Sequence, residues 1–110
     1  LRDLIIKYSP DAVVSIHGPL NCIDPDGGAN STRLARVMAR LSPLPIDDLE
    51  AFPGSMGSYC GETLGIAMVT YELDRKDVPK HGLKAYLEPH LPCMMAAIRA
   101  TTRTRSGVGQ

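Results

Sequence analysis

The sequence lacks an excess of charge of either sign, because its 12 basic and 12 acidic residues cancel. A chain without a basic surface has no general attraction for a nucleic-acid backbone or an anionic membrane surface. No apolar run approaches the roughly 20 residues that a membrane-spanning helix needs, and the first residues show no signal-peptide pattern. We therefore expect a soluble chain that binds neither nucleic acid nor membranes.

Cysteine is scarce as well, with only Cys22, Cys60 and Cys93 in the chain. They form no C-x-x-C pair and leave one thiol unpaired in any disulfide scheme. This pattern favours a reducing compartment, so we expect the cytoplasm. With 110 residues and no internal repeat, the chain has the size of one modest core.

Apolar periodicity covers most of the chain but not its end. Helical spacing begins at Leu1 and runs through Leu4, Ile5 and Tyr8, so we expect the chain to be cut from something longer. Residues 101–110 are polar and basic and carry no apolar period. We expect one unit over residues 1–100 and a flexible tail over residues 101–110.

Two β-branched, apolar runs predict buried strands over residues 12–16 and 66–73. The first is closed by His17, and the second carries Glu72 near its carboxyl end. The density of turn-forming residues between residues 20 and 30 predicts a loop directly after His17.

Helical patterns fill the remaining segments. Leu34, Val37, Met38 and Leu41 mark one face of a helix that Asn30 or Ser31 caps, and Ser55 caps a further helix that ends at Gly65. Two more helical patches lie at residues 83–87 and 91–98. This alternation predicts a layered α/β protein with a mostly parallel sheet. Because polar residues collect beyond the carboxyl ends of parallel strands, His17 and Glu72 are candidates for a shared site.

Each candidate also has a structural interpretation. A histidine that closes a strand is more often a hydrogen-bonded structural residue than a metal ligand. A carboxylate inside an apolar strand is costly unless an ion pair or a function compensates it, and for Glu72 both remain open. A glutamate beside a metal-ligating histidine can accept a proton from an attacking water. A nucleophilic Cys22 or Cys60 has no activating arrangement in the sequence, and Gly54–Gly57 does not follow a strand as a phosphate loop does.

Three sequence blocks resemble the carboxypeptidase A-type zinc peptidases, and in particular their bacterial murein-peptide amidase branch. The blocks are VVSIHGPLNCID at residues 13–24, PGSMGSYC at residues 53–60 and VTYEL at residues 69–73. They occur in the family's order and approximate spacing, over about residues 10 to 100. The resemblance implies the C-terminal half of a zinc-carboxypeptidase-like layered α/β domain.

The resemblance also implies a chemistry, the hydrolysis of a peptide bond. His17 becomes a zinc ligand and Glu72 the general base and then acid, acting on a murein peptide between γ-D-glutamate and meso-diaminopimelate. Ser55 would border the substrate's side-chain pocket, where free N–H groups at a helix start attract a carboxylate. Asp24 would instead meet the substrate's amino group.

The chain departs from the family at the metal site. Zinc needs about three protein ligands, and the family takes two of them from an H-x-x-E motif that no histidine of this chain begins. The segment before Pro53 has no tyrosine where classical members carry a mobile one. We therefore expect the isolated chain to be inactive, its partner to be the missing N-terminal half, and homo-oligomers to form. The alternative is a non-catalytic half-domain that acts as an association module.

Overall fold

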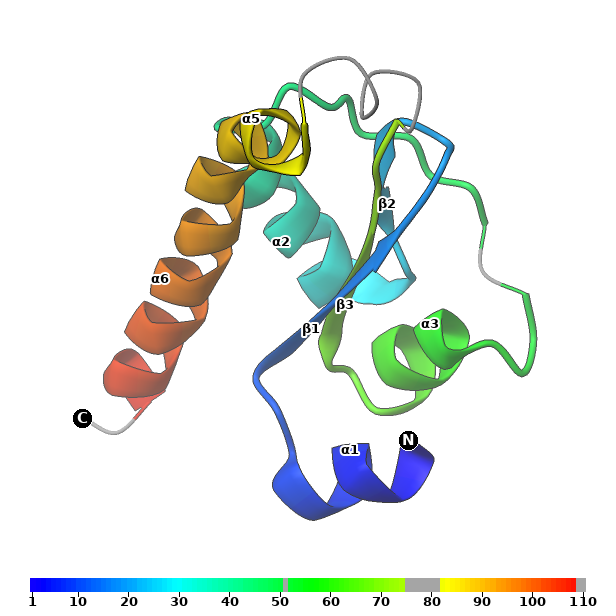
Figure 1. Ribbon diagram of the computed structural model, residues 1–110. Coiled ribbons are helices and arrows are strands. Elements are labelled where there is room, and N and C mark those ends of the chain that lie inside the picture. The colour runs from blue at the N-terminus through cyan, green and yellow to red at the C-terminus, as the bar shows by residue number, and fades with distance from the viewer. Residues whose placement is uncertain (51, 75–81, 109–110) are drawn as a thin grey trace.

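The computed structural model describes residues 1–50, 52–74 and 82–108, with side chains described as far as residue 101. Its elements are, in chain order, α1 (Arg2–Tyr8), β1 (Ala12–His17), β2 (Cys22–Pro25), α2 (Gly28–Ala39), α3 (Met56–Ser58), the π-helix η1 (Tyr59–Thr63), β3 (Ala67–Glu72), α5 (Leu83–Leu87), the 3₁₀-helix η2 (Glu88–His90) and α6 (Leu91–Val108). Figure 1 shows α2, α5 and α6 on one side of the strands and α1 and α3 on the other. No helix among the described residues has the length and apolar character needed to cross a bilayer.

The three strands form one sheet in the order β1-β3-β2. Strand β1 pairs with β3 in parallel, as the sequence predicted, but β2 pairs with β3 in the antiparallel direction. The described sheet is therefore mixed, and the expectation of a mostly parallel sheet is not confirmed. The prediction of a continuous loop over residues 20–30 was wrong, because β2 lies inside it and every residue of β2 is buried.

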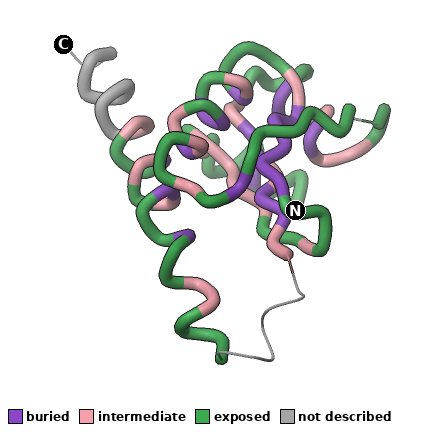
Figure 2. Tube along the Cα trace, turned by 90° about the horizontal axis from the view of Figure 1, so that it is seen from above, coloured by how far each residue is buried: buried purple, intermediate pink, exposed green. Residues whose placement is uncertain are grey.

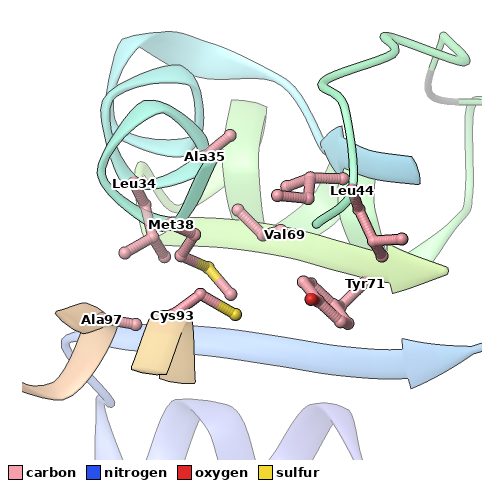
Figure 3. Close-up of a cluster of buried hydrophobic side chains, with 9 residues drawn as sticks. Leu34, Ala35, Met38, Leu44, Val69, Tyr71, Cys93 and Ala97 are labelled. Carbon is pink, nitrogen blue, oxygen red and sulfur yellow. The ribbon is translucent and has the colours of Figure 1, made fainter. Parts of the chain in front are cut away.

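One face of the sheet packs against α2 and α6 and forms the larger core. Val69 and Tyr71 of β3 meet Leu34, Met38 and Cys93 there (Figure 3). These strand positions alternate with polar ones because successive side chains point to opposite faces. Figure 2 shows the buried stretches gathered in the interior, with the outer faces of the helices exposed.

The opposite face carries a smaller apolar cluster at one end, in which Met68 of β3 contacts Ile5 of α1 and Cys60 of η1. Backbone segments approach closely beside it. A Cβ atom on Gly61 would lie 2.3 Å from the carbonyl oxygen of Asp26, which is inside any permitted contact. Glycine is required there, and it lets η1 support the segment that leaves β2.

Two helix boundaries differ from the sequence prediction. Helix α2 begins at Gly28, so Ser31 lies inside it, and the Ser31 hydroxyl accepts a hydrogen bond from the Met68 amide at 2.9 Å. Leu41 lies beyond the helix and is 51% exposed. Helix α6 continues to Val108, through a segment that we expected to be a flexible tail. That expectation rested on the threonine and arginine residues of the segment, which give it no apolar period. Residues 109 and 110 of that segment lie outside the described residues.

Candidate functional site

The two residues singled out by the sequence lie side by side at the carboxyl end of the parallel strand pair. His17 of β1 and Glu72 of β3 are partners in the register. Partners on neighbouring strands project their side chains from the same face of a sheet. The prediction that both strands lie parallel in one sheet is confirmed. The further expectation that His17 and Glu72 face a common cleft is not confirmed, because the cavity on this face is lined by His17 and not by Glu72.

Polar residues continue across this face in two rows. His17, Glu72 and Cys22 form the row at the strand ends, through the pairing of β1 and β2 with β3. Ser15, Thr70 and Asp24 form the row behind it. Because the opposite face is apolar and lies under α2 and α6, this polar face is the candidate site.

His17 is exposed, and one of its ring nitrogens already has a partner. Its Nε2 atom lies 2.7 Å from the hydroxyl of Ser15, two residues earlier on the same face. A hydrogen bond to one imidazole nitrogen fixes the ring orientation and leaves the other nitrogen to act. The remaining nitrogen, Nδ1, is thus the atom of His17 that is available to a ligand.

Glu72 is only 7% exposed. Its Oε2 atom accepts a hydrogen bond of 3.3 Å from the amide of Leu20, in the turn between β1 and β2. Among the described residues, the structure shows no ion pair for Glu72. The structural ion pair that we considered for this residue is therefore not found in that part of the chain.

A cavity of about 280 Å³ opens on the polar face. It is lined by three of the predicted site residues, His17, Asp24 and Ser55, whereas Glu72, which lies beside His17 in the same row, does not line it. The other lining residues come from β1, β3, the end of β2 and the segments around residues 50 and 56, and they are Ser15, Asp26, Leu49, Glu50, Phe52, Met56, Gly57, Met68 and Thr70.

Two buried aspartates line this cavity. Asp24 accepts a hydrogen bond from the amide of Leu49 at 3.1 Å, and Asp26 accepts one from the hydroxyl of Thr70 at 2.6 Å. Burial raises the pKa of both carboxyl groups above their ordinary values, and these hydrogen bonds oppose part of the rise. The nearby His17 also lowers the pKa of Asp26.

Ser55 sits at the start of the α3–η1 segment, as predicted. Its hydroxyl accepts a hydrogen bond from the amide of Ser58 at 3.1 Å and caps the first turn. The hydroxyl therefore holds the local backbone, while Ser55 as a whole lines the cavity. The sequence correctly located this residue at a helix start.

Asp26 and Thr70 are site residues that the sequence analysis missed. Asp26 was included only among the turn formers of the expected loop, and Thr70 only as part of an apolar strand. The signal for Asp26 was its spacing from Asp24, because residues two positions apart in an extended segment project from the same face of a sheet. Gly57 fits against the same carboxylate, because a Cβ atom there would lie 2.5 Å from Asp26 Oδ1.

The described residues contain no group of three histidine, cysteine, aspartate or glutamate side chains that could hold a metal ion. His17 alone does not make a zinc site, so the ligand set of this part of the chain does not fit zinc by itself. Burial, followed by the neighbouring carboxylates Asp47, Asp24 and Glu72, raises the pKa of the Cys22 thiol. A thiol kept protonated in this way is unsuited to nucleophilic attack.

Comparison with known proteins finds a likeness among solved structures. No family model matches the chain, and no curated protein matches it. Among solved structures, the murein-tripeptide amidase MpaA from Escherichia coli O157 is 29% identical over 84% of this chain, with a TM-score of 0.53. This likeness supports a relationship to the zinc carboxypeptidase-like murein amidases.

The chain spans 37% of the length of that murein-tripeptide amidase. It therefore corresponds to a part of the amidase fold, and the mixed sheet with its flanking helices is consistent with such a part. The resemblance found in the three sequence blocks and the structural likeness, which extends over most of the chain, lead to the same group of enzymes.

Proposed function

We propose that this chain contributes one wall of the active site of a zinc-dependent amidase that hydrolyses a peptide bond in murein peptides, between γ-D-glutamate and meso-diaminopimelate. The observation that carries this proposal is the pairing of His17 with Glu72 at the carboxyl end of a parallel strand pair, next to a cavity that His17 lines. The structural likeness to a murein-tripeptide amidase supports the reaction class.

His17 has the properties expected of a ligand residue. It is exposed, its Nε2 atom is held by Ser15, and its Nδ1 atom is left available. Since the described residues form no group of three possible metal ligands, we propose that polypeptide outside these 110 residues supplies the remaining ligands. When bound, zinc would polarise the scissile carbonyl and activate water. The isolated chain should bind zinc weakly and have no activity.

Glu72 is proposed as the group that takes a proton from the attacking water and then gives it to the leaving amine. Its Oε2 atom accepts a hydrogen bond from the Leu20 amide, which orients the carboxylate. Glu72 also lies beside His17 in the register of the two strands. A general base must lie within reach of the reacting water, and the position of Glu72 beside His17 supports this role.

The cavity is proposed to receive the substrate residue on the leaving-group side. Asp24 would meet an amino group of the substrate, since its buried carboxylate has no ion-pair partner among the described residues. Ser55 would border this pocket, with the first amides of its helical segment near a substrate carboxylate.

The test is Glu72→Gln in this chain joined to the rest of the amidase domain. Glutamine keeps the volume but cannot accept the proton, so kcat on a γ-D-glutamyl-diaminopimelate peptide should fall by about 10² to 10⁴-fold, with zinc content unchanged. His17→Ala should instead lower zinc content and activity together. The exposed Glu88→Gln serves as the matched control, and a near-normal kcat in Glu72→Gln would refute the role of Glu72.

A further inference from the structure

A second cavity, of about 480 Å³, opens beside the larger core, on the side of the sheet that the helices cover. It shares no described lining residue with the cavity that His17 lines. Its described lining residues come from the turn after β1, the loop after α2, the end of β3 and the α5–η2 segment, and they are Asn21, Pro43, Leu44, Asp74, Ala85, Tyr86, Pro89 and His90. Small-molecule sites in proteins have volumes of about 300–1,000 Å³, so this cavity has room for a ligand.

His90 presents to this cavity a hydrogen-bonding atom that the fold does not use. The residue is only 8% exposed, and its Nδ1 atom lies 2.6 Å from the hydroxyl of Tyr71. The structure shows no partner for its Nε2 atom among the described residues, although every fully buried side-chain nitrogen or oxygen atom in that part of the chain has one. Nε2 is therefore not sealed in the core, and because His90 lines the cavity, Nε2 opens into it.

The polar groups of the cavity favour a neutral ligand that carries hydroxyl groups. Burial lowers the pKa of His90, so its imidazole is uncharged at pH 7.5, and Nε2 donates or accepts according to the tautomer. A hydroxyl group can match either tautomer, and the side-chain amide of Asn21 supplies both a donor and an acceptor for further hydroxyls. The carboxylate of Asp74 also accepts hydrogen bonds from hydroxyl groups. No lysine or arginine occurs among the described lining residues, so these residues offer an anion no opposite charge.

The apolar walls of the cavity include rigid rings. The Tyr86 ring lies 5.7 Å from the His90 ring, and the Tyr86 hydroxyl donates to the carbonyl of Asp74, which fixes the ring at the cavity. Pro43 and Pro89 add two further rings to the lining. The face of an aromatic ring carries partial negative charge, so the C–H groups of a sugar ring pack favourably on it. A flat apolar surface beside groups that bind hydroxyls is the combination that a sugar ring requires.

We propose that this cavity binds a neutral monosaccharide unit, with Asn21 and His90 as the hydrogen-bonding residues and Tyr86 as the packing surface. The cavity is also connected to the proposed catalytic residue. Asn21 follows Leu20, whose amide donates to Oε2 of Glu72, so a ligand at Asn21 contacts the turn that orients this carboxylate. The inference rests on the cavity alone and does not require the proposed chemistry.

The experiment titrates the isotope-labelled chain with N-acetyl-D-glucosamine, a neutral sugar, and follows the backbone amide signals by NMR at pH 7.5. We expect binding in the millimolar range, with shifts at Asn21, Ala85 and His90. The signals of Gly57 and Met68, which line the other cavity, should not change. Glycerol, which has hydroxyl groups but no ring, should cause no shifts at the same concentration.

Two variants test the assigned roles. Tyr86→Leu removes the aromatic face and should weaken binding by roughly tenfold or more. Asn21→Gly removes the side-chain amide, and glycine accommodates the backbone φ of 54° at this position, so binding should weaken by about threefold or more. The control is Lys84→Ala, because Lys84 is 92% exposed on α5 and does not line the cavity; it should bind as the parent chain does. Thermal unfolding of each variant verifies that it remains folded.

Three results would overturn the inference. These are the absence of shifts around the cavity, equal shifts with glycerol, and an unchanged affinity in both Tyr86→Leu and Asn21→Gly. The titrations contain neither zinc nor a peptide substrate. A failure of the proposed hydrolysis would therefore leave the sugar site intact, and a failure of sugar binding would leave the proposed hydrolysis intact.

Discussion

The buried hydroxyl of Tyr71 provides a sharp test of how the larger core holds the end of β3. Tyr71 is fully buried, and its hydroxyl lies 2.6 Å from Nδ1 of His90 and 2.7 Å from the hydroxyl of Ser42. Burial lowers the pKa of His90, and the Tyr71 hydroxyl is the hydrogen-bond partner of Nδ1 in this buried site. Tyr71→Phe removes this hydroxyl and keeps the ring.

The expected cost follows from the groups left behind. The ring still fills its space, so no large cavity forms, but Nδ1 of His90 loses its hydrogen-bond partner in a buried site. An unsatisfied buried polar group costs about 1–3 kcal/mol, and Ser42 loses a partner that a rotated hydroxyl can partly replace. We expect the free energy of unfolding to fall by about 2 kcal/mol, which lowers Tm by roughly 8 °C for a chain of this size.

Urea unfolding followed by circular dichroism at pH 7.5 measures this loss, with Tyr8→Phe as the control because the Tyr8 side chain is exposed. The control should match the parent chain. If the free energy of unfolding fell equally in both variants, the Tyr71 hydroxyl would contribute nothing to the stability of the core. The argument that its hydrogen bond to His90 connects β3 with η2 would then be refuted.

Three further predictions concern pH and packing. The pKa of His90 is lowered in the folded state, so the contribution of His90 to the free energy of unfolding should be fully present above its ordinary pKa of about 6.5 and should fall as the pH drops below that value. Urea unfolding at several pH values should show this decrease in the parent chain and not in His90→Gln. Because the pKa of Asp26 is raised, its ionisation disfavours folding as the pH rises, so Asp26→Asn should be more stable than the parent at pH 7 and equal to it near pH 3. Gly61→Ala should lose at least the 1–3 kcal/mol typical of overpacking. Gly65→Ala should lose less, because its Cβ meets open space and only its φ of +66° opposes a side chain. An unchanged Tm in Gly61→Ala would refute the close approach to the Asp26 carbonyl.

The strands that carry the site were predictable because their own residues favour the strand conformation. The apolar runs before His17 and around Glu72 are β-branched and bounded by turn formers, and both became strands of the parallel pair. The alternation of α and β segments then predicted that the two strands are parallel, which places His17 and Glu72 at the same end of the sheet.

Strand β2 was not predictable in the same way, because tertiary contacts determine it. Its sequence Cys-Ile-Asp-Pro contains two residues that favour turns. It becomes a strand because Ile23 is held between β3 and the segment around Ile46, with no exposed surface left. The antiparallel direction of β2, and with it the mixed sheet, follows from the short turn between His17 and Cys22, which reverses the chain after β1. Asp26 was missed as a site residue because the strand before it was missed.

The carboxylates of the polar face are the strongest structural argument for a function at this site. Asp24, Asp26 and Glu72 are all buried, yet the structure shows no ion pair for any of them within the residues it describes. Their hydrogen bonds to Leu49, Thr70 and Leu20 compensate only part of the cost of burial. A core selected for stability alone would replace such groups with apolar ones. Features that oppose stability tend to occur where a functional site requires them. Here these features are the three buried carboxylates, and they lie on one face of the sheet, around the cavity and beside His17.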